Sequence, residues 1–203
     1  MVLGNKLGIS DAAELARVEE RLSKSKAYRL FTSGLLDTLK PGSFEALAAI
    51  HRYLFEDVCD FAGIVRTVNI AKGNFRFAPV MYLEAALQTI EAMPLSTVEQ
   101  IIEKYVEMNI AHPFREGNGR NARIWLDLML KKEVRKVVDW NRVDKNDYLM
   151  AMERRPVKDV EIKALLSSAL TAAIYDATVY MKGIDASYYY EGYNLYKAED
   201  LYL

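Results

Sequence analysis

This sequence is nearly without cysteine and has no long hydrophobic run. Its single cysteine, Cys59, excludes a disulfide within the chain and fits a reducing compartment. An apolar run of about 18 residues, which a transmembrane helix needs, is missing. Residues 1–6 carry no signal-peptide core. We therefore expect a cytoplasmic protein without a membrane partner.

The chain also lacks an excess of charge of either sign. Its 27 basic and 28 acidic residues leave a formal net charge of -1, with a pI of about 6.2. Such a balance does not attract nucleic acid in bulk, so nucleic acid is not an expected partner. Repeats and low-complexity linkers are missing too. The length suits a single domain, residues 1–203, with a sizeable core.

What the sequence does contain is helical periodicity along most of its length. Ser10 and the pair Ser96-x-x-Glu99 are expected helix caps, and Pro41-Gly42 and Gly183 are expected breaks. Gly73-Asn74, between two short β-prone runs, predicts a hairpin, with an irregular loop as the alternative. We expect an all-α bundle with one short β-hairpin and a core over about 10–182. Helices are expected over about 10–31, 43–61, 81–91, 96–112, 119–131, 144–153 and 157–175, with a turn or two more to 181.

One stretch, residues 112–123, is dense in reactive side chains. His112 can take a proton near neutral pH, and Glu116 can hold a hard cation. The glycines around Asn118 allow a tight turn and a close approach to a ligand. A glycine-rich loop that leads into a helix favours phosphate, because unpaired N–H groups and the helix dipole meet there. The stretch therefore predicts a base, a metal ligand and a phosphate cradle.

The same stretch resembles the signature of Fic domains, His-x-Phe-x-(Asp/Glu)-Gly-Asn-Gly-Arg-x-x-Arg, at every fixed position. His51-Arg52-Tyr53-Leu54-Phe55 and Phe61-Ala62-Gly63 are similar to a second Fic pattern, although His51 itself is expected to be a hydrogen-bonded core residue. Fic enzymes mostly transfer AMP from ATP to a hydroxyl side chain of a target protein. The resemblance therefore implies a Fic-type helical bundle, ATP as substrate and Mg²⁺ as cofactor.

The resemblance also implies roles for individual residues. His112 would be the base and Glu116 the ligand of Mg²⁺, which typically takes one or two carboxylates plus substrate phosphates. Arg120 would contact the β-phosphate side and Arg123 the γ-phosphate. Both would project from one face of the first helical turn. The phosphate-binding positions are Gly117, Asn118, Gly119, Arg120 and Arg123.

Two further residues are candidate nucleotide contacts. Lys72, at the turn of the hairpin, is expected to face the nucleotide. Asn109, one turn before His112, is either a nucleotide contact or a surface polar group. In Fic domains the element that matches the hairpin, about 64–79 here, is a flap that positions the target segment. An open strand edge can take up an extended segment as an added strand, so Phe75, Arg76 and Phe77 are candidates for docking the target protein.

The C-terminal segment resembles the inhibitory motif of Fic proteins, (Ser/Thr)-x-x-x-Glu-(Gly/Asn). Ser187, Glu191 and Gly192 match it, on an expected helix of about 185–192. Small bacterial Fic proteins with this motif at the C-terminus form their own class. A surface tail held by its tyrosines is the alternative. Tyr188 shares a helical face with Glu191 and is a candidate for self-modification with AMP.

Other functions remain open for the same residues. A nucleotide-binding regulator would use the phosphate cradle without turnover, although an intact His112 argues against it. Fic-type transfer of another phosphate-containing group, or removal of AMP, would use the same site. The intact Glu116 and both arginines favour AMP transfer. The resemblance suggests a type II topoisomerase subunit as a guess for the target, and it is compatible with a homo-oligomer.

Overall fold

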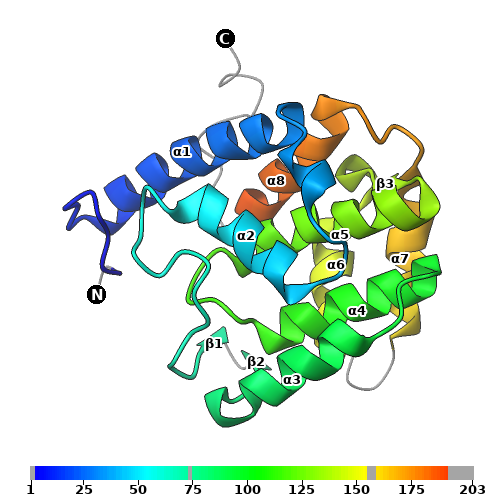
Figure 1. Ribbon diagram of the computed structural model, residues 1–203, viewed down its shortest axis with the longest axis horizontal. Helices are drawn as coiled ribbons and strands as arrows, with labels where there is room; N and C mark the ends of the chain where they lie inside the picture. The colour runs from blue at the N-terminus through cyan, green and yellow to red at the C-terminus, as the bar shows by residue number, and fades with distance from the viewer. Residues whose placement is uncertain (1–2, 73–74, 155–158, 192–203) are drawn as a thin grey trace.

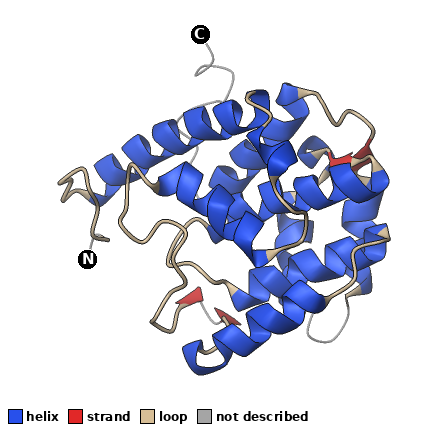
Figure 2. Ribbon diagram, in the orientation of Figure 1, coloured by secondary structure: helices blue, strands red, loops and turns tan. Residues whose placement is uncertain are grey.

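Helices form most of the protein in the computed structural model, which describes residues 3–72, 75–154 and 159–191 (Figures 1 and 2). This confirms the predicted all-α class. Two 3-10 turns, Leu35–Thr38 and Trp140–Arg142, connect longer elements. The α-helices are α1 (Ala12–Thr32), α2 (Phe44–Phe55), α3 (Val80–Ala92), α4 (Val98–Ala111), α5 (Asn118–Val134), α6 (Lys145–Arg154), α7 (Val160–Ser168) and α8 (Ala177–Glu191).

Helix α5 lies at the centre of the bundle, with α2, α4 and α8 packed against it. Its sequence is apolar on nearly every side, and from Asn118 to Leu130 every residue except Gly119 is buried. The indole N–H of Trp125 donates to the Ser43 carbonyl at 3.0 Å, so this polar atom of the core has a partner. A helix enclosed in this way holds its N-terminal residues in fixed positions.

Helices α1 and α8 come from opposite ends of the sequence and lie side by side (Figure 1). A buried group of charges joins them. The Lys24 ammonium lies 2.8 Å from the carboxylates of both Glu20 and Asp185. Removing one member of such a group leaves an uncompensated buried charge, which is strongly destabilising. The C-terminal helix is therefore tied to the N-terminal one by charge as well as by packing.

The predicted hairpin is present. Strand β1 (Ala71–Lys72) pairs with β2 (Phe75–Arg76) in antiparallel register, with Ala71 opposite Arg76 and Lys72 opposite Phe75. A second short pair was not predicted. Strand β3 (Val137–Val138) pairs with β4 (Leu170–Thr171), which closes the loop after α5 onto the end of α7.

Two helix caps differ from the predicted ones by one residue. Asp11, rather than Ser10, caps α1 and accepts the Glu14 N–H at 2.8 Å. The capping box of α4 is formed by Thr97 and Gln100 rather than by Ser96 and Glu99. Adjacent Ser/Thr and Glu/Gln pairs match the box pattern in two registers, and sequence spacing alone does not choose between them.

Three predicted helix boundaries were wrong. Helix α2 ends at Phe55, and the Phe55 carbonyl accepts the N–H groups of both Val58 and Cys59 in the turn that follows. Helix α7 ends at Ser168, where the chain turns into β4. Gly183 does not break α8. A Cβ at that position would lie 2.9 Å from the Trp140 ring, so Gly183 permits close packing instead.

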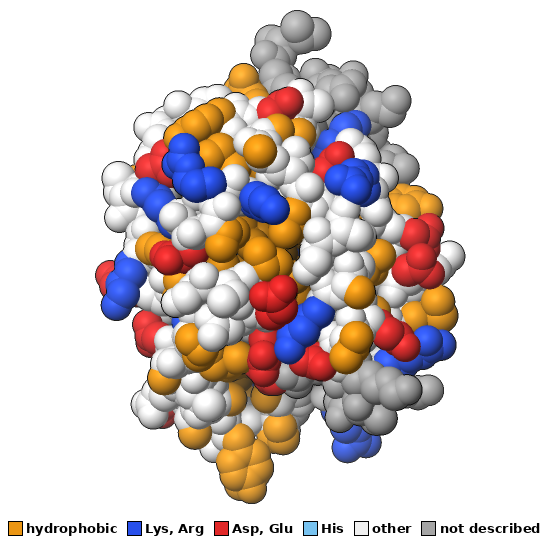
Figure 3. Space-filling view, turned by 90° about the vertical axis from the view of Figure 1, so that its right-hand side faces the viewer, with side chains coloured by type: hydrophobic (Ala, Val, Ile, Leu, Met, Phe, Trp, Pro, Cys, Tyr) orange, Lys and Arg blue, Asp and Glu red, His pale blue; other side chains and the backbone are white. Residues whose placement is uncertain are grey.

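Charged side chains are spread over the surface. On the face shown in Figure 3, basic and acidic side chains are interspersed, in keeping with the net charge of -1. Among the residues that the structure describes, no helix combines the length and the apolar character needed to cross a membrane.

Candidate active site

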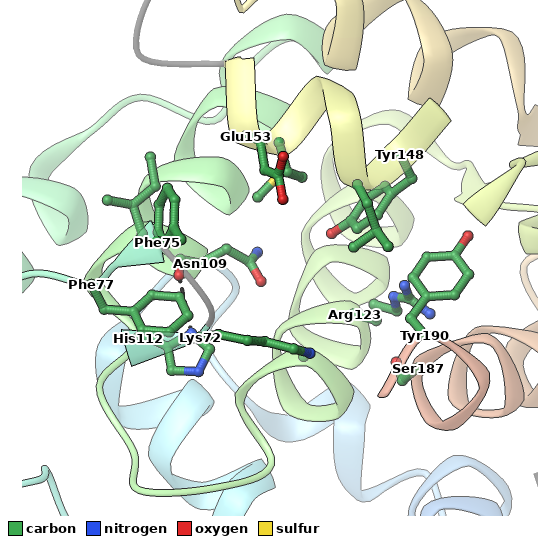
Figure 4. A pocket seen from close by; sticks show the side chains of 14 residues that line it. Lys72, Phe75, Phe77, Asn109, His112, Arg123, Tyr148, Glu153, Ser187 and Tyr190 are labelled. Carbon is green, nitrogen blue, oxygen red and sulfur yellow. Dashed lines mark hydrogen bonds between the residues drawn. The ribbon is translucent and has the colours of Figure 1, made fainter. Parts of the chain in front are cut away.

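A pocket of about 270 Å³ lies where the hairpin, the end of α4, the start of α5, and helices α6 and α8 meet (Figure 4). Figure 4 shows the hairpin residues and His112 on one side, with Arg123 and the α8 residues on the other. Six predicted site residues besides the hairpin aromatics line this pocket: Lys72, Asn109, His112, Gly119, Arg123 and Ser187.

His112 is held so that one ring nitrogen is available as a base. It is the C-cap of α4 and has a left-handed backbone, with φ of 51°. Its Nδ1 lies 3.2 Å from the Asn109 carbonyl. A carbonyl accepts only, so Nδ1 carries the proton and Nε2 keeps its lone pair.

The electrostatic environment also keeps His112 neutral. Burial lowers the pKa of His112 to about 4, only partly offset by the hydrogen bond to Asn109 and the charge of Glu116. The positive charges of Arg66 and Lys72 contribute to this lowering of the pKa. At neutral pH the imidazole is therefore ready to accept a proton.

The hairpin covers this base. The ring of Phe77, directly after β2, stacks on the His112 imidazole with 3.6 Å between centroids and 19° between planes. Phe75 packs edge-on against Phe77, with 5.2 Å between centroids. Both rings line the pocket, whereas Arg76 is exposed. Phe77, one of the residues predicted to dock the target, is therefore in direct contact with His112.

The loop after His112 is fastened by its own side chains. The Asn118 amide is buried and makes two bonds to Phe114, accepting its N–H at 2.9 Å and donating to its carbonyl at 2.7 Å. This side chain is thus used to close the loop, whereas the first N–H groups of α5 have no partner within the helix. Gly117 has φ of +75°, and a Cβ there would lie 2.5 Å from Phe55. Phe114 is fully buried and anchors the loop in the core.

His51 supports the same loop from below. Its Nδ1 accepts the Gly63 N–H at 2.8 Å, and its Nε2 therefore donates to the Glu116 carbonyl at 2.9 Å. Burial lowers the pKa of His51 to about 4, so the ring is neutral in the fold. This confirms the prediction that His51 is a hydrogen-bonded core residue.

Arg120 and Arg123 have different surroundings, although both were predicted to clamp phosphate. Arg120 is buried and does not line the pocket. It donates to Glu116 Oε1 at 2.9 Å, to the Tyr188 hydroxyl at 3.0 Å, and also to Glu19 of α1. The guanidinium of Arg120 is surrounded by α1, α8 and the loop. It therefore lies in the core behind the pocket and not in the pocket itself.

Arg123 lines the pocket, where aromatic rings flank it. Its guanidinium carbon lies 3.9 Å from the Trp140 ring centroid, 4.4 Å from that of Tyr190 and 5.3 Å from that of Tyr148. Its Nη1 donates to the Gly183 carbonyl at 3.1 Å. These contacts hold the planar cation against α8.

The residues of the C-terminal motif are divided between the pocket and the core. Ser187 lines the pocket and donates to the Gly183 carbonyl at 3.1 Å. Tyr188 points away from the pocket and is buried, with its hydroxyl bonded to Ser23 and Arg120. The side chain of Glu191 and all of Gly192 lie outside the described residues.

Sequence reasoning missed one wall of the pocket. Helix α6 contributes this wall, and α8 adds Tyr190 beside it. The Tyr148 hydroxyl is hydrogen-bonded to that of Tyr105 at 2.7 Å, which fixes its ring. The four-residue spacing of Tyr148 and Met152 was the available signal, but it resembles an ordinary packing stripe. The missed α6 residues are Tyr148, Leu149, Met152 and Glu153.

Glu116 has the chemistry expected of a magnesium ligand. Its side chain is 45% exposed, and both of its hydrogen bonds, from Arg120 and from the Gly117 N–H, use Oε1. Within the described ranges, no three His, Cys, Asp or Glu side chains gather into a metal-binding group. A single accessible carboxylate fits Mg²⁺ that is completed by substrate phosphates and water.

Comparison with known proteins identifies the family. The profile of the Fic/DOC family matches residues 41–130. The probable protein adenylyltransferase y4lH of Sinorhizobium fredii is 30% identical over 165 residues, which are 75% of this chain and 82% of that protein. The chain belongs to the Fic/DOC family. The probable protein adenylyltransferase Fic of Salmonella typhimurium is 28% identical to this Fic protein, over 85% of the chain and 89% of the relative.

The match is not equally complete for every relative. The protein adenylyltransferase VbhT of Bartonella schoenbuchensis is 33% identical over 74% of this chain, but the chain spans only 33% of VbhT. Among solved structures, the BepC protein of Bartonella tribocorum with bound AMPPNP has a TM-score of 0.67 at 19% identity, covering 84% of this chain and 93% of that one. A Fic domain from Bartonella quintana with bound ADP has a TM-score of 0.68 at 20% identity, covering 84% and 91%. These likenesses show that the fold is the Fic fold.

Proposed function

We propose that this protein transfers AMP from ATP to a hydroxyl side chain of a target protein. The proposal depends mainly on the state of His112, which is a neutral imidazole whose Nε2 can accept a proton. His112 lies at the edge of a pocket that Arg123 and the start of α5 also line. The relatives named as protein adenylyltransferases support the same activity.

The proposed step balances without a further reactant. Nε2 of His112 takes the proton of the target hydroxyl, and the hydroxyl oxygen forms a bond to the α-phosphorus of ATP. The bond from that phosphorus to the bridging oxygen breaks, and pyrophosphate leaves with the electron pair. AMP remains on the target as a phosphodiester, and the proton on His112 passes to solvent.

The pocket offers matching groups for a nucleotide. Lys72 and Arg123 supply positive charge, and the N-terminus of α5 at Gly119 supplies N–H groups and the positive end of the helix dipole for phosphate. Tyr148, Leu149 and Met152 give an apolar wall suited to a base. Glu116, on the loop before α5 and outside the lining of this pocket, would hold Mg²⁺, which supplies neutralising charge to the phosphates when bound.

The contacts of α8 support an autoinhibited resting state. Arg123, the expected γ-phosphate ligand, is engaged by the Gly183 carbonyl and the Tyr190 ring of α8, and by the ring of Trp140 from the 3-10 turn. Ser187 lines the pocket on this side. A lock of about 1–3 kcal/mol would suppress the productive state by about 5- to 150-fold. In this proposal Glu191 completes the lock by pairing with Arg123.

The target is proposed to dock on the hairpin. Among the described residues, strands β1 and β2 form a two-stranded sheet with open edges, and Phe77, directly after β2, stacks on His112. An extended segment added there would bring its hydroxyl close to the base. A type II topoisomerase subunit remains our guess for this target.

Labelling with ATP tests the proposal. The protein is incubated with Mg²⁺, ATP labelled at the α-phosphate and a cell lysate, and His112→Ala at equal folded concentration is the matched control. Labelled protein bands that need His112 support transfer. Binding of ATP without label in any band would instead indicate a nucleotide-binding regulator. In a parallel incubation with ATP labelled at the γ-phosphate, bands labelled there and not from the α-phosphate would indicate phosphate transfer.

A further inference from the structure

One buried arginine outside the signature connects the base to the hairpin. Arg66 is 2% exposed and does not line the pocket. Its side chain makes four hydrogen bonds, all to backbone carbonyls. Nε donates to His112 at 2.7 Å, Nη1 to Val68 at 2.7 Å, and Nη2 to Ala78 at 2.6 Å and Ala111 at 3.1 Å.

These four carbonyls belong to three different pieces of the site. Val68 lies on the chain that enters the hairpin, and Ala78 lies on the chain that leaves it. Ala111 and His112 are the last residue and the C-cap of α4, where the carbonyls have no partner within the helix. The backbone N–H of Arg66 adds a bond to the Pro113 carbonyl at 2.8 Å.

The buried cation of Arg66 depends on these hydrogen bonds. Within the part of the chain that the structure describes, Arg66 has no carboxylate partner. Its burial is compensated only by these carbonyls, and a buried cation without them is costly. Charge-assisted bonds from a planar fork fix direction as well as distance. The His112 backbone held here is in the left-handed region, which residues with a side chain adopt uncommonly.

We propose that Arg66 is a positioning residue. It holds the backbone of His112 and the chain on either side of the hairpin, at Val68 and Ala78, in one fixed arrangement. The stacking of Phe77 on His112 then depends on Arg66, although the guanidinium touches neither ring nor pocket. The consequence for catalysis rests on the proposed function, but the positioning itself can be measured without any activity.

Proton NMR of the histidine rings tests the positioning directly. The chain has two histidines, and each is stacked on a phenylalanine: His112 on Phe77, and His51 on Phe114 at 4.0 Å between centroids. Arg66→Met should remove the ring-current shift of the His112 signal and leave that of His51 in place. The acid titration of His112 should also move upward, because one of the two cations that oppose its protonation is gone, while Lys72 and Glu116 remain.

Lys104→Met is the matched control. Lys104 is also a buried cation bonded to carbonyls, those of Glu91 at 2.9 Å and Met93 at 3.1 Å, but it lies away from the pocket. Both variants lose a buried cation, and only Arg66→Met should change the His112 signal. Where Arg66→Met does not fold, Arg66→Lys, which keeps the charge and loses the fork, should give a smaller shift of the same sign. An unchanged His112 signal in a folded Arg66 variant overturns the proposal.

Activity provides the second readout. Arg66→Met should lower kcat about 10- to 100-fold, the cost expected of a misplaced catalytic group, with the Kd for ATP nearly unchanged. Lys104→Met should keep kcat. Equal kcat in Arg66→Met and wild type overturns the inference alone, whereas a wild type that labels no protein overturns the proposed function and leaves the NMR result to decide the positioning.

Discussion

The imidazole of His112 and the ring of Phe77 lie stacked, with 3.6 Å between their centroids. The proposed base at the end of α4 and the hairpin that is expected to hold the target are therefore in direct contact. A change in the hairpin should reach the base through this pair.

Phe77→Ala should lower AMP transfer about 10- to 100-fold through loss of the base's orientation, while ATP binding is nearly unchanged. Tyr82→Ala is the control, because Tyr82 is an exposed aromatic residue of α3 outside the pocket. Initial labelling rates and ATP affinity are compared for both. Equal loss of rate and of ATP affinity in Phe77→Ala would instead point to a nucleotide contact or a misfolded hairpin.

His112→Ala should abolish transfer and leave folding and ATP binding roughly intact. Loss of a general base typically costs about 10² to 10⁴-fold. The rate of labelling from α-labelled ATP measures this loss. A variant that keeps more than about a tenth of wild-type activity would contradict the assigned role.

The histidine pKa values predict how activity depends on pH. Because burial lowers the pKa of His112 to about 4 and the neutral form is the base, kcat/KM should be level at neutral pH. It should fall only as the pH approaches 4. A fall centred near 6.5, the ordinary histidine value, would show that the ring is not desolvated in the free protein.

Stability should depend on pH through the same groups. The pKa values of His112 and His51 are about 4 in the fold and 6.5 by reference, so between those values the unfolded chain binds more protons. Stability is therefore lost as the pH falls through this window, by up to about 1.4 kcal/mol per pH unit for each histidine. Urea unfolding at pH 7, 6 and 5 should show a shallower dependence for His112→Gln than for wild type.

Glu191→Gly should raise AMP transfer about 5- to 150-fold if the C-terminal motif holds the enzyme off. Arg123→Ala should not activate, because it removes the proposed phosphate ligand together with the lock. Truncation before Ser187 is a poorer test, since it also removes the buried Tyr188. Initial rates at equal folded concentration decide the point, and an unchanged rate in Glu191→Gly would make the segment an ordinary tail.

Self-modification at Tyr188 should require α8 to move. Its hydroxyl is buried and bonded to Ser23 and Arg120, and burial raises its pKa well above the usual value. Peptide mapping after incubation with ATP and Mg²⁺ should therefore find AMP on Tyr188 in Glu191→Gly more than in wild type. Equal labelling of Tyr188 in both proteins would show that release of α8 does not control access.

Local sequence determined the parts of this protein that depend on neighbours along the chain. The signature at 112–123 predicted the tight turn that the structure contains, and it named His112 and Glu116 as the expected base and metal ligand, because each expectation follows from residue type at short spacing. The hairpin and the buried central helix were predictable for the same reason, since periodicity and a Gly-Asn turn act over a few residues. The caps of α1 and α4 were missed by one residue, because adjacent residues offered equivalent hydrogen bonds.

Only the tertiary structure decided which chemistry each side chain is free to perform. In the sequence, Arg120 and Arg123 are equivalent arginines three residues apart. In the fold, Glu19, which is distant in sequence, binds Arg120 outside the pocket, whereas Arg123 lines the pocket. The α6 wall and the four carbonyls around Arg66 likewise come from segments joined by folding. Burial and hydrogen-bond partners set the charge and the availability of a side chain, and these depend on residues that spacing along the sequence does not identify.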